Sequence, residues 1–266
     1  MDKITNHSLF GMKGESRKIA CLTVYDYSFA TVLDQAGIDV VLVGDSLGNT
    51  IQGQESTLPV TMDEMVYHAR CVSRGIERAL IVVDMPFMSF QASVEQSVAN
   101  AGRLVKEGFA EMVKLEGGAV VLDQVKAITD ASIPVCAHLG LLPQSVHKLG
   151  GYKVQGRDPG AAEKMLNDAV ALQEAGATLL VLEAIPGVLA AEITQALRIP
   201  TIGIGAGPDT DGQVLVLQDM LGIYPRKSPK FSRNFMIDAD SIQGAIKAYV
   251  DAVKNHTFPT AEHSFD

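Results

Sequence analysis

A unit made of a helical stretch, a small or glycine-containing turn and a short β-branched run recurs along the chain. The interiors of these runs are continuous Val, Ile and Leu, a pattern typical of parallel strands that are covered by helices on both faces. The eight runs span residues 19–27, 39–46, 79–87, 110–118, 133–141, 178–186, 199–207 and 213–221. The repeat therefore predicts an α/β fold built on a parallel sheet.

Eight strands in 266 residues favour a closed (β/α)8 barrel, or TIM barrel, over an open doubly wound sheet. The open sheet predicts a G-x-G-x-x-G turn after the first strand, but this turn reads VYDYSFA. With no Ser/Gly-rich linker in the chain, we predict one domain over residues 1–266. It includes a short N-terminal extension (about 1–18) and a C-terminal helix (about 240–255).

The last strand is ambiguous in the sequence. Too few residues for a full helix separate IGIGAG (202–207) from VLVLQDML (214–221). Either the seventh helix is reduced to a turn, or VLVLQDML is itself helical and the eighth strand lies elsewhere.

Several helix boundaries carry recognisable signals. Predicted N-terminal caps are Thr61 with Glu64, Ser93 with Gln96, Asp158 before Pro159, and Asp240 at the last helix. Glycines that follow helical periodicity and precede a strand predict left-handed C-terminal turns, at Gly37, Gly108 and Gly176.

The charge balance narrows the functional classes. Lys plus Arg number 22 and Asp plus Glu number 31, which gives a net charge of −9. This balance argues against partners such as duplex nucleic acid or an anionic membrane. We also expect no membrane span or secretory signal, because no apolar run approaches about 20 residues. Three scattered cysteines (Cys21, Cys71 and Cys136) suit a reducing, cytoplasmic location.

Ionisable residues gather at the carboxyl ends of the predicted strands. They are Asp26, Asp45, Asp84, Glu116, His138 and Glu183. A single Asp in such a place is usually a helix cap, and Asp26 fits that reading. Strand ends of a barrel converge on one mouth, however, and several carboxylates there repel one another unless a cation offsets them. The pattern predicts a bound divalent metal.

The residue types favour Mg²⁺, because carboxylates without a His/Cys cluster suit a hard, oxygen-preferring ion. Asp45 and Asp84 lie on neighbouring strands and are the expected direct ligands. Glu116 is expected to bind the metal directly or to hold a metal-bound water.

Further candidates for substrate contacts surround these acids. Lys114 points to the same side of its strand as Glu116, where it pairs with a substrate carboxylate or forms a structural salt bridge. Ser46 is a donor to a bound anion or a turn former, and His138 is a hydrogen-bonding core group or a base. The glycines of GIGAG (203–207) cradle a phosphate or form a close-packed turn.

The segment HLGLLPQSVHKLGGYKVQGR (138–157) is too long for a simple strand-to-helix turn and is rich in donors. It is interpreted as a lid or substrate loop.

Long motifs throughout the chain resemble the ketopantoate hydroxymethyltransferase family. The matching stretches include TVYDYSFA (23–30), LVGDSLGN (42–49), DMPFMSF (84–90), VKLEGG (113–118), VCAHLGLLPQSVHKLGGYKVQGR (135–157), DGQVLVLQD (211–219) and PKFSRNF (229–235). The sequence departs from the family pattern at Asn49, at Leu142 and in the Pro-Arg-Lys-Ser segment at 225–228. These departures leave the strand-end acids untouched.

The resemblance implies a barrel of the phosphoenolpyruvate/pyruvate type that binds one Mg²⁺ per subunit and assembles as a cytoplasmic homodecamer. It implies transfer of a hydroxymethyl group from 5,10-methylenetetrahydrofolate to 3-methyl-2-oxobutanoate. The products are 2-dehydropantoate and tetrahydrofolate, formed through an enolate that Mg²⁺ stabilises, in pantothenate biosynthesis.

By the same resemblance Asp45 and Asp84 ligate Mg²⁺, Glu116 completes that site, and Glu183 is the proton acceptor. Ser46 and Lys114 contact the keto acid, and we expect His138 beside it. The folate-binding residues are not indicated. The alternatives are a Mg²⁺-dependent lyase similar to isocitrate lyase and a non-catalytic metabolite-binding barrel.

Overall fold

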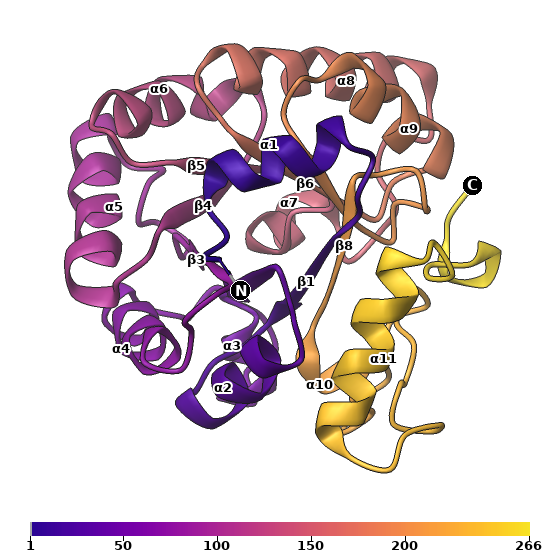
Figure 1. Cartoon of the computed structure of the whole chain (residues 1–266). Helices are drawn as coiled ribbons and strands as arrows, with labels where there is room; N and C mark the ends of the chain where they lie inside the picture. Colours follow the sequence, from indigo (N-terminus) through magenta and orange to yellow (C-terminus); the bar gives the residue numbers. More distant parts are fainter. Residues whose placement is uncertain (1) are drawn as a thin grey trace.

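The computed structural model describes residues 2–266 and confirms the predicted (β/α)8 barrel (Figure 1). Residue 1 of the expected N-terminal extension lies outside this range. Each strand pairs in parallel with the next, and β8 pairs with β1 to close the sheet. The strands are β1 (Ile19–Thr23), β2 (Val40–Val43), β3 (Leu80–Asp84), β4 (Met112–Glu116), β5 (Val135–Gly140), β6 (Leu179–Glu183), β7 (Thr201–Ile204) and β8 (Gly212–Leu215).

The longer helices between the strands surround the barrel (Figure 1). The α-helices are α1 (Asn6–Gly14), α2 (Tyr27–Gln35), α3 (Leu47–Thr50), α4 (Met62–Ser73), α5 (Val94–Gly108), α6 (Leu122–Asp130), α7 (Val146–Leu149), α8 (Pro159–Glu174), α9 (Gly187–Ala196), α10 (Leu217–Met220) and α11 (Ile242–Lys254). Short 3₁₀ turns are η1 (Ala119–Val121), η2 (Pro143–Ser145) and η3 (Ala261–His263). Within the described residues, no helix is both long and apolar enough to cross a bilayer.

Most of the predicted N-terminal caps are confirmed. Thr61 and Glu64 form a complete capping box, and the side chains of Ser93 and Asp158 cap α5 and α8. The last helix begins one residue later than expected, because Ser241 rather than Asp240 supplies its cap.

The predicted C-terminal turns are confirmed at Gly37 and Gly176, which both have positive φ. The prediction for Gly108 was wrong, because the left-handed residue is Phe109 (φ 61°). Gly108 instead allows α5 to approach α4 closely, since a Cβ there would lie 3.1 Å from Cβ of Ala69.

The structure between β7 and α10 resolves the ambiguity about the eighth strand. A turn without a helix joins β7 to β8, and the VLVLQDML segment then contributes both the end of β8 and the short helix α10. The first of the two sequence alternatives is therefore right for the strand, and the second half of the segment is helical.

Two apolar layers stabilise the barrel. One fills the space between the sheet and the outer helices. The other fills the barrel interior, where Leu9 and Met12 of α1 pack against inward-facing strand residues such as Ile19 and Met112. In Figure 1 helix α1 lies across one end of the barrel. Apolar side chains thus occupy the interior and leave the carboxyl ends of the strands to the polar residues.

Strand register places those polar residues side by side. Asp84 of β3 pairs with Lys114 of β4, and Glu116 pairs with His138 of β5. Glu183 ends β6 opposite Gly140. The closed sheet therefore brings residues that are about 100 positions apart into one cluster at the barrel mouth.

Candidate active site

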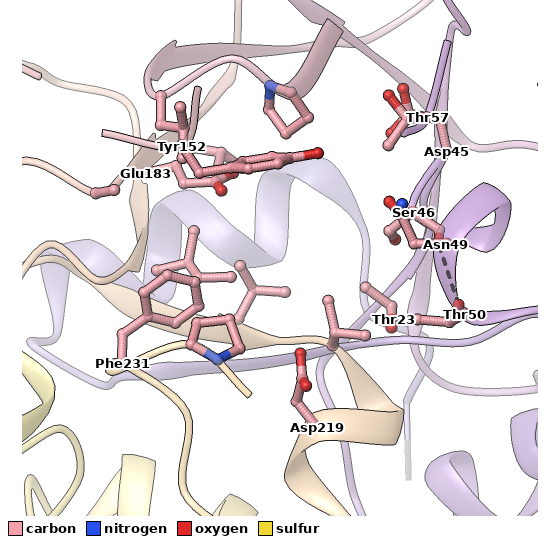
Figure 2. Close-up of a pocket in the computed structure, with 18 of the residues that line it drawn as sticks. Thr23, Asp45, Ser46, Asn49, Thr50, Thr57, Tyr152, Glu183, Asp219 and Phe231 are labelled. Carbon is pink, nitrogen blue, oxygen red and sulfur yellow. Dashed lines mark hydrogen bonds between the residues drawn. The ribbon is translucent and has the colours of Figure 1, made fainter. Parts of the chain in front are cut away.

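A cavity of about 610 Å³ opens at the carboxyl ends of the strands. Seven of the residues that the sequence singles out line it, namely Asp45, Ser46, Asp84, Lys114, Glu116, His138 and Glu183. Figure 2 shows Asp45 and Ser46 on one side of this pocket and Glu183 with Tyr152 on another. Asp26 is not part of it, because its side chain caps α2 through the N–H of Phe29.

Asp45, Asp84 and Lys114 form the charged centre of the pocket, and all three are buried. The backbone N–H of Asp45 donates to Oδ2 of Asp84 at 3.0 Å, and Nζ of Lys114 lies 3.0 Å from Oδ1 of the same residue. Burial disfavours the ammonium, but the surrounding acids Asp84, Glu116 and Asp45 raise the pKa of Lys114 above its usual value. The lysine therefore stays charged inside the barrel.

The buried environment destabilises the ionised forms of two carboxyl groups, Asp45 and Glu116. Burial, followed by repulsion from Asp84, raises the pKa of Asp45 to about 7. Burial and the charge of Asp45 also raise the pKa of Glu116 well above its usual range. Lys114 offsets only part of this negative charge, so the arrangement favours a bound cation.

Asp45 and Asp84 fit a hard cation better than a closed zinc cage. Oδ1 of Asp84 is buried and accepts no aligned hydrogen bond from any described residue, although Lys114 is close. No group of three or more His, Cys, Asp or Glu side chains within residues 2–266 converges as a metal cage. A cation here would therefore take the remaining ligands from substrate and water, as Mg²⁺ commonly does.

His138 connects Lys114 to Glu183. Its Nδ1 lies 3.3 Å from Nζ of Lys114, and its Nε2 lies 3.3 Å from Oε2 of Glu183. Burial and the charge of Lys114 lower the pKa of His138 well below its usual value, so the ring is neutral. Because an ammonium can only donate, Nδ1 accepts and the ring proton resides on Nε2, facing Glu183. Burial raises the pKa of Glu183 to about 7.

Ser46 is held at the pocket wall by a buried tyrosine. The hydroxyls of Tyr25 and Ser46 lie 2.8 Å apart, and Tyr25 also donates to Oγ1 of Thr23. Gly44 makes this arrangement fit, because a Cβ there would come within 2.7 Å of Oγ of Ser46. The end of β2 thus places Asp45 and Ser46 together without a bulky residue before them.

The GIGAG segment forms a close-packed turn rather than an open cradle. Gly205 has positive φ (62°), and a Cβ there would lie 2.7 Å from Phe231 and 3.0 Å from Phe265. A Cβ at Gly207 would lie 3.0 Å from Cα of Gly187. These glycines admit neighbouring parts of the same chain, which supports the packing alternative.

A family model described as ketopantoate hydroxymethyltransferase matches residues 3–261. The chain belongs to the ketopantoate hydroxymethyltransferase family. The protein of Alkalilimnicola ehrlichii that is named 3-methyl-2-oxobutanoate hydroxymethyltransferase is 56% identical to this chain, over 98% of this chain and 94% of the relative. The corresponding protein of Colwellia psychrerythraea is 56% identical over 100% of both chains. The one from Nitrosococcus oceani is 57% identical, again over 100% of both.

Solved structures with low sequence identity share the fold of this chain. A phosphonopyruvate hydrolase, in complex with oxalate and Mg²⁺, has a TM-score of 0.62 at 12% identity and covers 81% of each chain. A 2,3-dimethylmalate lyase of the PEP mutase/isocitrate lyase superfamily has a TM-score of 0.60 at 17% identity, over 81% of this chain and 79% of its own. At such identities the likeness shows the barrel fold alone.

Gln144 is a residue of the candidate site that sequence reasoning missed. It is buried in η2, where its side-chain amide donates to Oδ2 of Asp45 and to the carbonyl of Met85, both at 2.9 Å. Its backbone N–H donates to Oε2 of Glu116 at 3.1 Å. The only signal in the sequence was its place in the long donor-rich loop after β5.

Proposed function

We propose that the protein transfers a hydroxymethyl group from 5,10-methylenetetrahydrofolate to 3-methyl-2-oxobutanoate, giving 2-dehydropantoate and tetrahydrofolate. Family membership supports the hydroxymethyl transfer and the keto-acid acceptor. The observation that carries the proposal is that Glu183, with a pKa of about 7, faces the same pocket as Asp45, Asp84 and Lys114. One pocket thus holds a candidate base and a candidate site for a chelating keto acid.

Asp45 and Asp84 would hold Mg²⁺, and Glu116 would bind it directly or through a water. When bound there, Mg²⁺ would act as a Lewis acid that stabilises negative charge on the keto oxygen. The raised pKa values of Asp45 and Glu116 support this assignment, because a cation relieves the repulsion that burial intensifies.

Lys114, Ser46 and His138 would position the keto acid. The Lys114 ammonium would pair with the substrate carboxylate, and its ion pair with Asp84 keeps it charged before substrate arrives. Tyr25 donates its own proton to Thr23, so the Ser46 hydroxyl donates to Tyr25 before substrate binds and would turn its proton to the same anion when the substrate arrives. Neutral His138 would keep Lys114 and Glu183 apart while contacting both.

Glu183 would remove the proton from C3 of the keto acid. A pKa of about 7 suits this role, because the carboxylate is then present at neutral pH and is basic enough to accept a proton. Nε2 of His138 lies 3.3 Å from Oε2 of Glu183 without an aligned hydrogen bond, and a small rotation of the carboxyl group would let it accept from this N–H. Asp84 and Lys114 on β3 and β4 would thus serve binding, and His138 and Glu183 on β5 and β6 would serve proton transfer.

The resulting enolate carbon would then form a C–C bond with the methylene carbon of the folate. Both C–N bonds from that carbon to the folate break. One water supplies the hydroxyl group of the product and one proton, and the proton removed from C3 is the second of the two that the folate nitrogens take up. The net reaction consumes one keto acid, one methylenetetrahydrofolate and one water.

The test is turnover of 3-methyl-2-oxobutanoate by the purified protein, with and without methylenetetrahydrofolate and with and without Mg²⁺. We expect C3 proton exchange into deuterated water with Mg²⁺ alone, and 2-dehydropantoate only when the folate is added. Cleavage of a C–C bond without folate would favour the lyase alternative. If the protein neither exchanges the C3 proton nor forms a product from the keto acid, the result would support the alternative of a non-catalytic barrel.

We propose further that the protein works in the cytoplasm as a homo-oligomer, a decamer as the resemblance implies. All three cysteines are unpaired, which suits a reducing compartment. Light scattering after size exclusion is expected to give ten times the chain mass, and a monomer would contradict the assembly.

A further inference from the structure

The pocket has two halves of different chemistry. The strands from β2 to β6 supply the ionisable cluster. The aliphatic walls are formed by Leu42 of β2, Val181 of β6, Ile204 of β7, Val214 of β8 and Val216 just after β8. A five-carbon keto acid fills only a small part of about 610 Å³. The aliphatic half therefore has room for a second, larger and flatter ligand.

Asp219 is a charged residue within this aliphatic half. It belongs to α10, is 7% exposed, and lines the pocket. Its Oδ1 is buried and accepts no hydrogen bond from any described residue. Figure 2 shows Asp219 on the opposite side of the pocket from Tyr152 and Glu183, with its carboxyl group pointing into the pocket. Because a buried oxygen without a donor is costly, Asp219 is suited to a ligand that brings N–H donors.

We propose that Asp219 binds the pterin ring of the folate co-substrate, an inference that rests on the proposed function. The 2-amino-4-oxopterin ring carries an amino N–H and a ring N–H side by side on one edge. A carboxylate accepts both with parallel hydrogen bonds, as it does from an arginine. The aliphatic walls cover the faces of the ring, and its other end lies toward the keto-acid half of the pocket.

The outer edge of the same pocket is suited to the glutamate tail of the folate. Lys153, Arg226, Lys227 and Lys230 line it and are here called the basic rim. Across residues 2–266, none of these four cations has a carboxylate within 4.0 Å, as the ion pairs of the structure show. Arg226 donates to the carbonyl of Gly53, and Lys230 lies 5.1 Å from the ring centre of Phe265. The cations thus remain available to the carboxylates of the tail.

The first experiment compares Asp219→Asn with the wild type. We expect tetrahydrofolate to bind about 10- to 100-fold more weakly to the variant by anaerobic calorimetry. Mg²⁺-dependent C3 proton exchange, measured without folate, is expected to stay within about 2-fold of wild type because it needs no pterin. Asp209→Asn, at an exposed acid in the turn before β8, is the matched control. Unchanged tetrahydrofolate affinity, or loss of exchange together with binding, overturns the assignment.

A second measurement uses the wild type and does not depend on how the variant folds. A tetrahydrofolate analogue with methyl in place of the 2-amino group should bind about 10-fold more weakly or worse, because Asp219 loses one donor. Equal affinity for the two ligands would contradict the proposed contact.

The basic rim is tested with the double variant Arg226→Ala/Lys227→Ala. Wild type should prefer triglutamyl over monoglutamyl tetrahydrofolate, and the double variant should lose about 2- to 10-fold of that preference. Lys247→Ala, on the outer helix α11, is the control. Retained preference would remove the rim from the site.

If wild type neither binds tetrahydrofolate nor uses methylenetetrahydrofolate, the proposed function itself fails. Normal turnover by the wild type, together with variants whose folate affinity is unchanged, rejects only this subsite.

Discussion

The side-chain amide of Gln144 donates a hydrogen bond to Oδ2 of Asp45, with 2.9 Å between the two heavy atoms. The residues come from opposite sides of the barrel mouth, one from the loop after β5 and the other from the end of β2. Gln91 fixes the orientation of the amide by donating to Oε1 of Gln144 at 3.1 Å. The loop after β5 thus determines which oxygen of Asp45 remains available to a cation.

Gln144→Ala should weaken Mg²⁺-dependent binding of 3-methyl-2-oxobutanoate by about 10-fold, because Asp45 loses its positioning partner. The hydrogen bond from Gln144 also favours the ionised form of Asp45, so its loss raises the pKa of that carboxyl further. Calorimetric titration of the keto acid at several Mg²⁺ concentrations measures the effect. Gln96→Ala, on the exposed face of α5, is the control. Affinity equal to wild type would show that Asp45 needs no such support.

Glu183→Gln should abolish C3 proton exchange while leaving Mg²⁺ and keto-acid binding intact. We expect the exchange rate to fall by at least about 100-fold, the usual contribution of a general base. NMR in deuterated water follows the loss of the C3 proton signal, and Glu192→Gln on α9 serves as the matched surface variant. Normal exchange in Glu183→Gln would eliminate this residue as the base.

The pH profile of the exchange provides a separate test of Glu183. A base must be deprotonated, and burial raises the pKa of Glu183 to about 7. The value of kcat/KM should therefore increase tenfold per pH unit below about 7 and level off above it. A flat profile between pH 5 and 8 would contradict the raised pKa.

Much of the site could be predicted from strand ends alone. In a barrel the carboxyl ends converge whatever the helices do, so Asp45, Asp84, Glu116 and Glu183 come together as expected. The distances within the cluster depend on register and burial, which a sequence does not display. Gln144 was missed because its contacts come from an irregular loop, where neither periodicity nor strand ends indicate the direction of a side chain.

The alternatives for Lys114 show the same limit. The structure contains the ion pair with Asp84, which was one of the two readings, and the pairing with a substrate carboxylate stays a prediction.

Lys114→Met keeps the length of the side chain and removes its charge. Affinity for the keto acid should fall by at least about 10-fold at saturating Mg²⁺, since a charged hydrogen bond is lost. If Mg²⁺ binding disappears while the keto acid still binds, Lys114 has a different role.

The metal-free protein should become more stable when Asp45 is neutralised, and increasingly so as pH rises. Burial and Asp84 raise the pKa of Asp45 from 3.8 to about 7. The folded state therefore binds more protons at this carboxyl than the unfolded chain between those values. The free energy of unfolding consequently falls as pH rises through this window.

In Asp45→Asn this contribution is absent, whereas His138 and the other titrating groups remain. The stability difference between variant and wild type should grow by about 2 kcal/mol from pH 5 to pH 8. Urea denaturation in EDTA at the two pH values measures it, with Asp240→Asn as an exposed control. Millimolar Mg²⁺ should shrink the advantage at pH 8, because a cation held by Asp45 stabilises only the wild type. A difference that is independent of both pH and Mg²⁺ would mean that Asp45 neither titrates near pH 7 nor binds the metal.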